Sequence, residues 1–294
     1  MTAQDAPATG SLLRDLISLS KPRLSSLVIF TGGIGLLLAP GEKAWDRSIL
    51  VVTALVLVVA AANTLNNFLE RDSDRGMART ATRPLPTRRI SPWVALFQGL
   101  LLTVVSVPLL TMVANPLTGL LGAVALLLYV LVYTPLKRST SLSTIVGAIP
   151  GAMPPLMGWT AATGTLDAGG LALFAVLFTW QLPHFLAIGL YRAPEYASAG
   201  LVVHAIEIGP VRTRRRAVAW TVALLISSAM LVVTGVGGML TGLAAAALGV
   251  GFMGRALKGL RPDADDVWAR GLFRYSLVYL TVLFAVMAVD KVLL

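Results

Sequence analysis

The residues of this chain that first point to chemistry are an amide and three carboxylates, which lie within nine residues at the end of a long apolar run. Asn66, Glu70 and Asp74 follow one another at intervals of four, so a continuous helix would place their oxygens on one face, with Asp72 between the last two. Acidic groups gathered in this way repel one another unless a cation lies between them, and Mg²⁺ suits an all-oxygen site with a phosphate partner. The segment therefore predicts half of a metal and diphosphate site at a membrane face.

Basic residues that could bind a diphosphate lie close to these carboxylates. Guanidinium groups form paired hydrogen bonds with phosphate oxygens. Further along the chain, Lys137 and Arg138 could clamp the same anion, although basic residues at helix ends also serve as ordinary membrane anchors. The arginines that follow the acidic segment are Arg71, Arg75, Arg79, Arg83, Arg88 and Arg89.

A second group of polar residues lies in and just beyond another apolar segment. Gln181 and His184 interrupt a stretch that is otherwise apolar enough to cross a membrane, and Pro183 permits a kink there. An ionisable residue inside a span is a functional hypothesis by default, and the alternative is a histidine that packs between helices and bonds a neighbouring carbonyl. Glu195 follows just past this span, as Glu70 does past its own. We therefore expect the two acidic clusters to face one cavity from opposite sides.

The overall composition is typical of a polytopic all-α membrane protein. Hydrophobic residues make up 56% of the chain and charged residues 13%, against about 45–50% and 25% in soluble domains, and the mean hydropathy is +0.79. The chain has no cysteine, which excludes disulfides, thiolate nucleophiles and iron–sulfur clusters. Residues 1–20 lack the pattern of a signal peptide, so we expect a cytoplasmic tail at 1–20 and a single transmembrane domain at 21–294.

The apolar runs predict nine transmembrane helices around a central cavity. With the amino terminus in the cytoplasm, 21 of the 24 lysines and arginines fall inside, as the positive-inside rule expects. The charge of +10 is therefore a topology signal, and nucleic-acid binding is a poor explanation of it. The inner loops 69–91 and 191–216 are long and polar, so we expect the chemistry on the cytoplasmic face. The Gly- and Pro-rich segment 147–158 predicts a broken or closely packed helix. The spans are expected near 24–40, 48–68, 92–113, 117–135, 141–160, 170–190, 217–236, 238–254 and 271–290.

These motifs resemble those of the UbiA-type intramembrane prenyltransferases and, within that family, of its haem-farnesylating branch. The resemblance runs in order from about Lys21 to Gly209. The acidic runs alone indicate only the wider family, whereas the Met-x-Arg-Thr string at 77–80 and the Trp-Gln-x-Pro-His-Phe string at 180–185 point to the haem branch. The other matching strings are Asn66-Asn67 with the acidic run to Asp74, Arg83-Pro84-Leu85, Tyr133-Thr134 with Lys137-Arg138, Gly151-Ala152 with Pro154-Pro155, and Gly158-Trp159.

The resemblance implies an enzyme that uses Mg²⁺ to hold the diphosphate of a polyprenyl donor, so that the allylic C–O bond can ionise. In the haem branch the donor is farnesyl diphosphate, the acceptor is the vinyl group of haem B (protohaem IX), and the product is haem O. An iron porphyrin needs room and an axial ligand, for which the chain offers only His184 and His204. Carried over residue by residue, the implied metal ligands are Asn66, Glu70, Asp72, Asp74 and Glu195, the diphosphate-binding residues are Arg79, Arg83, Lys137 and Arg138, and the catalytic residues are Lys137, Arg138 and His184.

The resemblance also implies a cellular setting. We expect an integral protein of the bacterial cytoplasmic (inner) membrane, in contact with the lipid bilayer and with its active-site loops on the cytoplasmic side. Haem A synthase or a terminal oxidase is the expected assembly partner.

Two departures from the family pattern leave alternatives open. Glu70 and Glu195 stand where the family usually has aspartate, and each added methylene moves a carboxylate by roughly a bond length in a sphere held near 2.0–2.1 Å. The run 199–205 also lacks the usual continuation of the second motif. The alternatives are the same chemistry on an aromatic or quinone-precursor acceptor, a catalytically reduced paralogue that serves as a scaffold, and a transporter with midplane polar groups. Carboxylates gathered at one membrane face favour the diphosphate site over the transporter.

Overall fold

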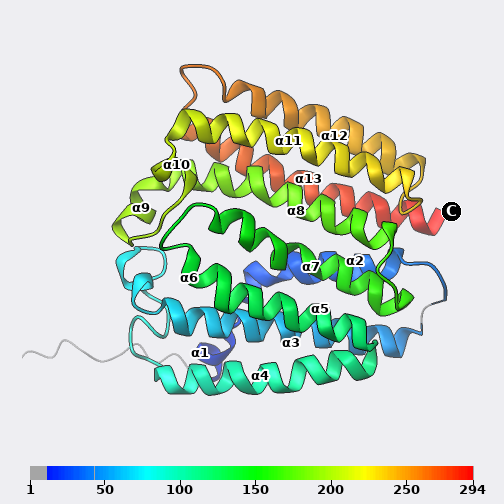
Figure 1. Ribbon diagram of the computed structural model, residues 1–294, viewed down its shortest axis with the longest axis horizontal. Coiled ribbons are helices and arrows are strands. Elements are labelled where there is room, and N and C mark those ends of the chain that lie inside the picture. The colour runs from blue at the N-terminus through cyan, green and yellow to red at the C-terminus, as the bar shows by residue number, and fades with distance from the viewer. Residues whose placement is uncertain (1–11, 43, 294) are drawn as a thin grey trace, which may run out of the picture.

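Helices make up all the regular structure of the computed structural model, which describes residues 12–42 and 44–293, without the side chains of residues 23 and 24. The long helices run side by side (Figure 1). They are α2 (Pro22–Leu38), α3 (Trp45–Glu70), α4 (Pro92–Val113), α7 (Ser143–Thr163), α8 (Ala168–Tyr191), α11 (Pro210–Val233), α12 (Met239–Lys258) and α13 (Asp266–Leu293), together with α5 (Pro116–Leu127), which continues through the π-helical η2 (Leu128–Tyr133) into α6 (Thr134–Leu136). The short helices are α1 (Leu12–Leu19), η1 (Ser73–Gly76), α9 (Ala193–Ser198) and α10 (His204–Glu207).

Each of the nine predicted spans coincides with one of the long helical segments in the described part of the chain. Seven of these segments are long and apolar enough to cross a membrane on their own. The other two are α2, which has 17 residues, and α7, which contains three prolines. The all-α, membrane-spanning architecture is thus confirmed, and nine as the number of spans stays a prediction.

Charge is segregated between the two ends of the bundle. The connections that follow α3, α6, α8 and α12 lie at one end, on the left in Figure 1, and the C-terminus lies at the other. The first end therefore carries the basic segments 71–89, 137–138 and 192–216, whereas Arg47 and Lys291 lie at the opposite end. Lys43, the other predicted outer cation, is outside the described residues. The side of the membrane that each end faces stays a prediction.

The Gly- and Pro-rich segment forms a single helix, α7, whose backbone approaches that of α2 closely. A Cβ atom on Gly158 would lie 2.0 Å from the Gly32 carbonyl oxygen, and one on Gly35 would lie 2.2 Å from the Pro155 carbonyl oxygen. Only glycine permits this distance, and small residues at helix crossings are the usual means of packing in membranes. The structure therefore has the closely packed form of this helix rather than the broken one.

The second half of the bundle is joined by an apolar core and by buried hydroxyl pairs. The core lies among α8, α11, α12 and α13 and includes Phe252 and Phe284, both fully buried. Ser227 Oγ on α11 lies 2.8 Å from Thr179 Oγ1 on α8, and Tyr279 Oη on α13 lies 2.7 Å from a neighbouring serine of α11. Because lipid is as apolar as the helix surfaces, such interhelical hydrogen bonds help to fix the register.

The contact between α2 and α7 can be tested with one substitution and a matched control. We predict that Gly158→Ala lowers the free energy of unfolding by about 1–3 kcal/mol, because the new methyl group meets backbone atoms that cannot move aside. Gly33→Ala on α2 should leave stability unchanged or slightly raised, because the nearest atom to its Cβ is 4.0 Å away. Thermal unfolding of both purified variants in the same detergent would measure this, and an equal loss in both would contradict the prediction.

Candidate active site

The three connections that follow α3, α6 and α8 contact one another at one end of the bundle (Figure 1). The backbone amide of Val202 donates to the carbonyl oxygen of Lys137 over 2.9 Å. Ser198 Oγ donates to the carbonyl oxygen of Gly76 over 3.4 Å. The two acidic segments expected to face each other are therefore adjacent, although they lie more than a hundred residues apart in the sequence.

Glu70 is the centre of a buried group of polar side chains. It is the last residue of α3 and is 5% exposed. Asn66, one turn earlier, donates from Nδ2 to Glu70 Oε1 and, over 3.0 Å, to Thr134 Oγ1. Lys137 Nζ forms an ion pair with the same oxygen of Glu70. Asn66 and Glu70 thus share one helix face, and Lys137 lies beside them.

Asp74 belongs to the same region but not to the same helix. The sequence spacing predicted a continuous helix through Asp74, whereas α3 ends at Glu70 and Asp74 lies in the short helix η1. Arg83 Nη1 donates to Asp74 Oδ2 over 2.8 Å and to Asn67 Oδ1 over 3.4 Å. Asp74 is 1% exposed, and its Oδ1 atom is buried without a hydrogen-bond partner. The turn after Glu70 therefore brings Asp74 to the site in a way that helical periodicity did not anticipate.

Asp72 lies apart from this group. Its side chain is 63% exposed, and its carboxylate oxygens lie 3.8 Å from Arg71 and 3.5 Å from Arg75. These are ion pairs at the surface, where solvent screens the charges and the contribution to stability is small. The structure therefore places Asp72 outside the buried set in which the sequence resemblance included it.

Lys21 is a site residue that the sequence analysis missed. It precedes α2 in a left-handed backbone conformation, with φ at 50°, and its Nζ donates to Asn66 Oδ1 over 2.6 Å. Burial lowers the pKa of Lys21 to about 8, a fall that the nearby Glu70 carboxylate opposes. A lysine just before an apolar run already has an explanation as a topology signal. Only the contact with Asn66, 45 residues away, indicates a second role.

Glu195 contributes a carboxylate from the other side of the site. It lies in the first turn of α9, where its Oε2 accepts from Arg192 Nη1 over 2.5 Å. This hydrogen bond raises the pKa of Arg192. Glu195 Oε1 is buried without a hydrogen-bond partner and lies 4.0 Å from Arg79 Nε. Arg79 comes from the connection after α3, so this contact joins the two acidic segments.

Two other predicted residues lie at the margin of the site or beyond it. Arg138 is exposed and donates from Nη2 to the Leu69 carbonyl over 3.4 Å and to Ser73 Oγ over 3.3 Å, so it holds the end of α3. His184 lies within α8, where its Nδ1 is 2.7 Å from Ser276 Oγ on α13. The contacts of His184 in the described residues are with α8 and α13 and not with the carboxylates.

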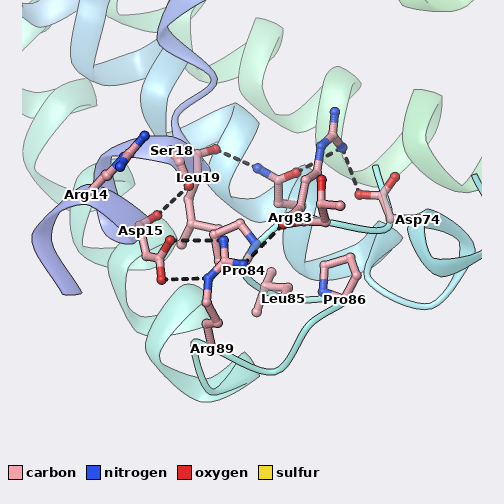
Figure 2. A pocket seen from close by; sticks show the side chains of 12 residues that line it. Arg14, Asp15, Ser18, Leu19, Asp74, Arg83, Pro84, Leu85, Pro86 and Arg89 are labelled. Atoms are coloured by element: carbon pink, nitrogen blue, oxygen red, sulfur yellow. Dashed lines mark hydrogen bonds and ion pairs between the residues drawn. The ribbon is translucent and has the colours of Figure 1, made fainter. Parts of the chain in front are cut away.

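A cavity of about 710 Å³ opens beside Asp74, between α1 and residues 82–89. Figure 2 shows Arg83 directed toward Asp74 on one side of it and the Asp15–Arg89 ion pair on the other. That pair has two contacts, of 3.1 and 3.2 Å, and it ties α1 to the connection after α3. The cavity thus lies directly beside the buried Asp74 carboxylate.

The donor atoms of the site fit a hard divalent cation. No three acidic or histidine side chains of the described residues are close enough to form a metal site by themselves, and Glu70, Asp74 and Glu195 each face a basic residue. Their donors are nevertheless all oxygens, as Mg²⁺ prefers. Two of these oxygens, Asp74 Oδ1 and Glu195 Oε1, are buried without a hydrogen-bond partner, which is costly unless a ligand satisfies them.

The model of the UbiA prenyltransferase family matches residues 27–278 of this sequence. The chain belongs to the UbiA prenyltransferase family. A protoheme IX farnesyltransferase of Anaeromyxobacter sp. (strain Fw109-5) is 50% identical over 283 residues, which cover 96% of this chain and 95% of that protein. The membership makes the chain a prenyltransferase-family enzyme, as its motifs indicated.

Solved structures share the fold of this UbiA-family chain. A digeranylgeranylglyceryl phosphate synthase has a TM-score of 0.82 and 17% identity, covering 96% of this chain and 99% of its own. A UbiA homologue from Archaeoglobus fulgidus, bound to DMAPP and Mg²⁺, has a TM-score of 0.68 and 16% identity, covering 94% of this chain and 99% of its own. The likeness in fold thus extends over almost the whole chain.

Lys21 should make the site sensitive to pH. Its ammonium is charged below a pKa of about 8 and neutral above it, so its attraction for an anion weakens as the pH rises through that value. We predict that the affinity of the protein for inorganic diphosphate with Mg²⁺ falls about tenfold between pH 7 and pH 9, as the charged fraction falls. Lys21→Arg should keep its affinity over this range, because arginine stays charged.

Titration calorimetry at several pH values would measure this dependence. The exposed Lys258 at the end of α12 provides the control, because Lys258→Arg should follow the wild type. Lys21→Met should bind diphosphate weakly at every pH, because it has no charge at this position. This variant tests the role of Lys21 even if arginine does not fit there. Equal loss of affinity in the wild type and in Lys21→Arg would rule out Lys21 as the titrating group.

Proposed function

We propose that this chain transfers the farnesyl group of farnesyl diphosphate to a vinyl group of protohaem IX, giving haem O. The observation that carries the proposal is the buried group of carboxylates and basic side chains around Glu70, set at the end of an apolar bundle where the diphosphate and the hydrocarbon of a prenyl donor can be held together. The 50% identity to a protoheme IX farnesyltransferase over nearly the full chain supports the choice of donor and acceptor.

The residues of the site divide between the metal and the diphosphate. Mg²⁺, when bound, supplies positive charge that stabilises the diphosphate as it leaves the farnesyl carbon. Asn66, Glu70, Asp74 and Glu195 would hold it, since they bring the buried oxygens of the site. The fold neighbour from Archaeoglobus fulgidus, which is bound to DMAPP and Mg²⁺, supports the choice of a divalent metal and a prenyl diphosphate but does not test these residues.

The basic residues would bind the oxygens of the diphosphate and bear its charge as the C–O bond breaks. Three of them form ion pairs with the carboxylates, and Lys21 bonds the Asn66 amide oxygen, so a metal that takes over these oxygens would release the cations toward the diphosphate. Arg138 would not bind the diphosphate directly. It would position the end of α3 through its hydrogen bond to the Leu69 carbonyl oxygen. The residues with this proposed role are Lys21, Arg79, Arg83 and Lys137.

The apolar bundle has a part in the chemistry as well. The terminal vinyl carbon of the porphyrin attacks C1 of the farnesyl group as the C–O bond breaks, and water then adds to the neighbouring vinyl carbon and loses a proton. Helices around the farnesyl chain would keep bulk water from capturing the allylic cation before the vinyl group does. We propose that residues 21–294 form one catalytic domain for this reaction, behind a tail at 1–20.

The cellular setting is part of the proposal. Basic residues gathered at the end that carries the site support a cytoplasmic location for that end, in a bacterial inner membrane. The product would pass to enzymes that modify or insert haem O, so haem A synthase or a terminal oxidase is the proposed partner.

A product assay tests the function together with the role of Glu70. Purified protein in lipid, supplied with Mg²⁺, haem B and farnesyl diphosphate, should form haem O detectable by mass spectrometry. Glu70→Gln should lower the rate by about 10²-fold or more, because the buried carboxylate loses its charge while its size is kept. Asp72→Asn provides the contrast and should change the rate little, because that carboxylate is exposed.

The other outcomes of this assay separate the alternatives. Farnesyl diphosphate consumed with an aromatic or quinone-precursor acceptor, but without haem O, would keep the prenyl transfer and overturn the acceptor. No consumption of any donor would point to a scaffold. A loss in Asp72→Asn equal to that in Glu70→Gln would overturn the distinction between the two carboxylates.

The role of Glu195 in holding the metal predicts a change in the Mg²⁺ requirement. Glu195→Gln should raise the Mg²⁺ concentration needed for half-maximal activity by about tenfold, because it removes one charged oxygen donor from the set. Glu207→Gln, in nearby α10, should leave the requirement unchanged, because Glu207 accepts hydrogen bonds from Ser141 and Thr140 instead. Activity measured against free Mg²⁺ gives both values, and the same half-maximal Mg²⁺ concentration for wild type and Glu195→Gln would exclude Glu195 as a ligand.

A further inference from the structure

His184 occupies a defined position between α8 and α13 that the proposed diphosphate site does not use. Its Nδ1 atom lies 2.7 Å from Ser276 Oγ. The imidazole ring lies between the rings of Trp180 and Phe273, with centroid distances of 4.8 and 4.9 Å, and Phe185 approaches it edge-on at 5.4 Å. Hydrogen bonding and aromatic contacts thus fix the orientation of the ring.

The hydrogen bonds of Ser276 determine which nitrogen of His184 carries the proton. Ser276 Oγ donates its single proton to the carbonyl oxygen of Phe273 over 2.6 Å. The Oγ atom can therefore only accept from His184, so Nδ1 is the donor. In the neutral imidazole this leaves Nε2 with an unprotonated lone pair.

This second nitrogen has no partner among the described residues. His184 is 8% exposed, and its Nε2 atom keeps some accessible surface, since it is not among the completely enclosed unpartnered atoms. Aromatic rings lie close to it, and no donor of the described residues satisfies its lone pair. A histidine that binds a transition metal is usually neutral and fixed in orientation. One ring nitrogen binds the metal, and the other donates a hydrogen bond to a positioning group.

We propose that Nε2 of His184 is the protein ligand of the iron of the porphyrin acceptor, and that Ser276 is its positioning residue. The inference rests on the proposed function, which brings an iron porphyrin to this chain. The surrounding aromatic rings offer flat apolar faces to a macrocycle. His184 lies seven residues before the end of α8, about 10 Å along the helix from the end of the bundle that carries Glu70 and Glu195.

His204, the other histidine of the chain, is less suited to this role. It lies in α10 among the polar connections, and its Nδ1 atom is completely enclosed without a hydrogen-bond partner. No hydrogen bond from the described residues therefore fixes its tautomer. Burial and the nearby Arg216 lower the pKa of His204, so it is neutral as well. The two histidines differ in positioning rather than in charge, which makes His204 the matched comparison.

The test is a titration of the full-length protein in lipid nanodiscs with ferric haem B, followed by absorption and electron paramagnetic resonance. The wild type and His204→Ala should give the spectrum of an imidazole-ligated haem. His184→Ala should lose that spectrum, and added free imidazole should restore it. Ser276→Ala should keep the type of spectrum but raise the dissociation constant for haem by about 10–100-fold, as loss of a group that orients a ligand does. The backbone carbonyl of Ser276 that accepts from Trp180 remains in that variant.

The remaining outcomes separate this inference from the proposed function. An unchanged haem spectrum in His184→Ala, with haem O still formed by the wild type, would overturn the iron ligand and leave the function intact. Loss of the spectrum in His204→Ala alone would assign the ligand to the other histidine and overturn the proposal. Failure of the wild type to form haem O from farnesyl diphosphate would overturn the function itself. Size-exclusion profiles of each variant identify any loss that comes from misfolding.

Discussion

The interaction on which this site depends is the pairing of buried carboxylates with cations that come from distant parts of the chain. Glu70 and Asp74 are almost completely buried, and an isolated carboxylate in such a place is unstable. Lys137 pairs with the first and Arg83 with the second, while Lys21 bonds the adjacent Asn66. Lys21 precedes α2, Arg83 follows α3 and Lys137 follows α6. The pairing therefore fixes the ends of three helical segments relative to one another.

The same pairing prepares the site for its proposed ligands. In the protein alone, Glu70, Asp74 and Glu195 each form an ion pair with a basic residue, which offsets much of the cost of burying their charge. A metal and a diphosphate exchange these internal pairs for external ones, with the carboxylates turning to the cation and the basic groups to the anion. Asp74 Oδ1 and Glu195 Oε1 still lack a hydrogen-bond partner, and they lie on the two segments that the ligands would join.

Much of this arrangement could be predicted from the sequence where one strong local signal decides it. Apolar runs marked the helices, and the four-residue spacing brought Asn66 and Glu70 to one face. The spacing failed at Asp74, because the chain leaves the helix after Glu70 and tertiary contacts with Arg83 set its position. Lys21 was missed for a related reason, since its partner lies 45 residues away and a basic residue before a span has a ready explanation in topology.

His184 shows how far a sequence can lead and where coordinates become necessary. A histidine inside an apolar segment is noticeable, but its spacing does not distinguish a packing role from a binding role. The structure is consistent with both roles. The ring packs against aromatic residues, and its Nε2 atom has no hydrogen-bond partner among the described residues. The His184 ring also contacts Phe273, which in turn contacts Tyr191. The Arg192 guanidinium lies over the Tyr191 ring and donates a hydrogen bond to Glu195. A continuous row of side-chain contacts therefore joins the proposed acceptor and donor sites.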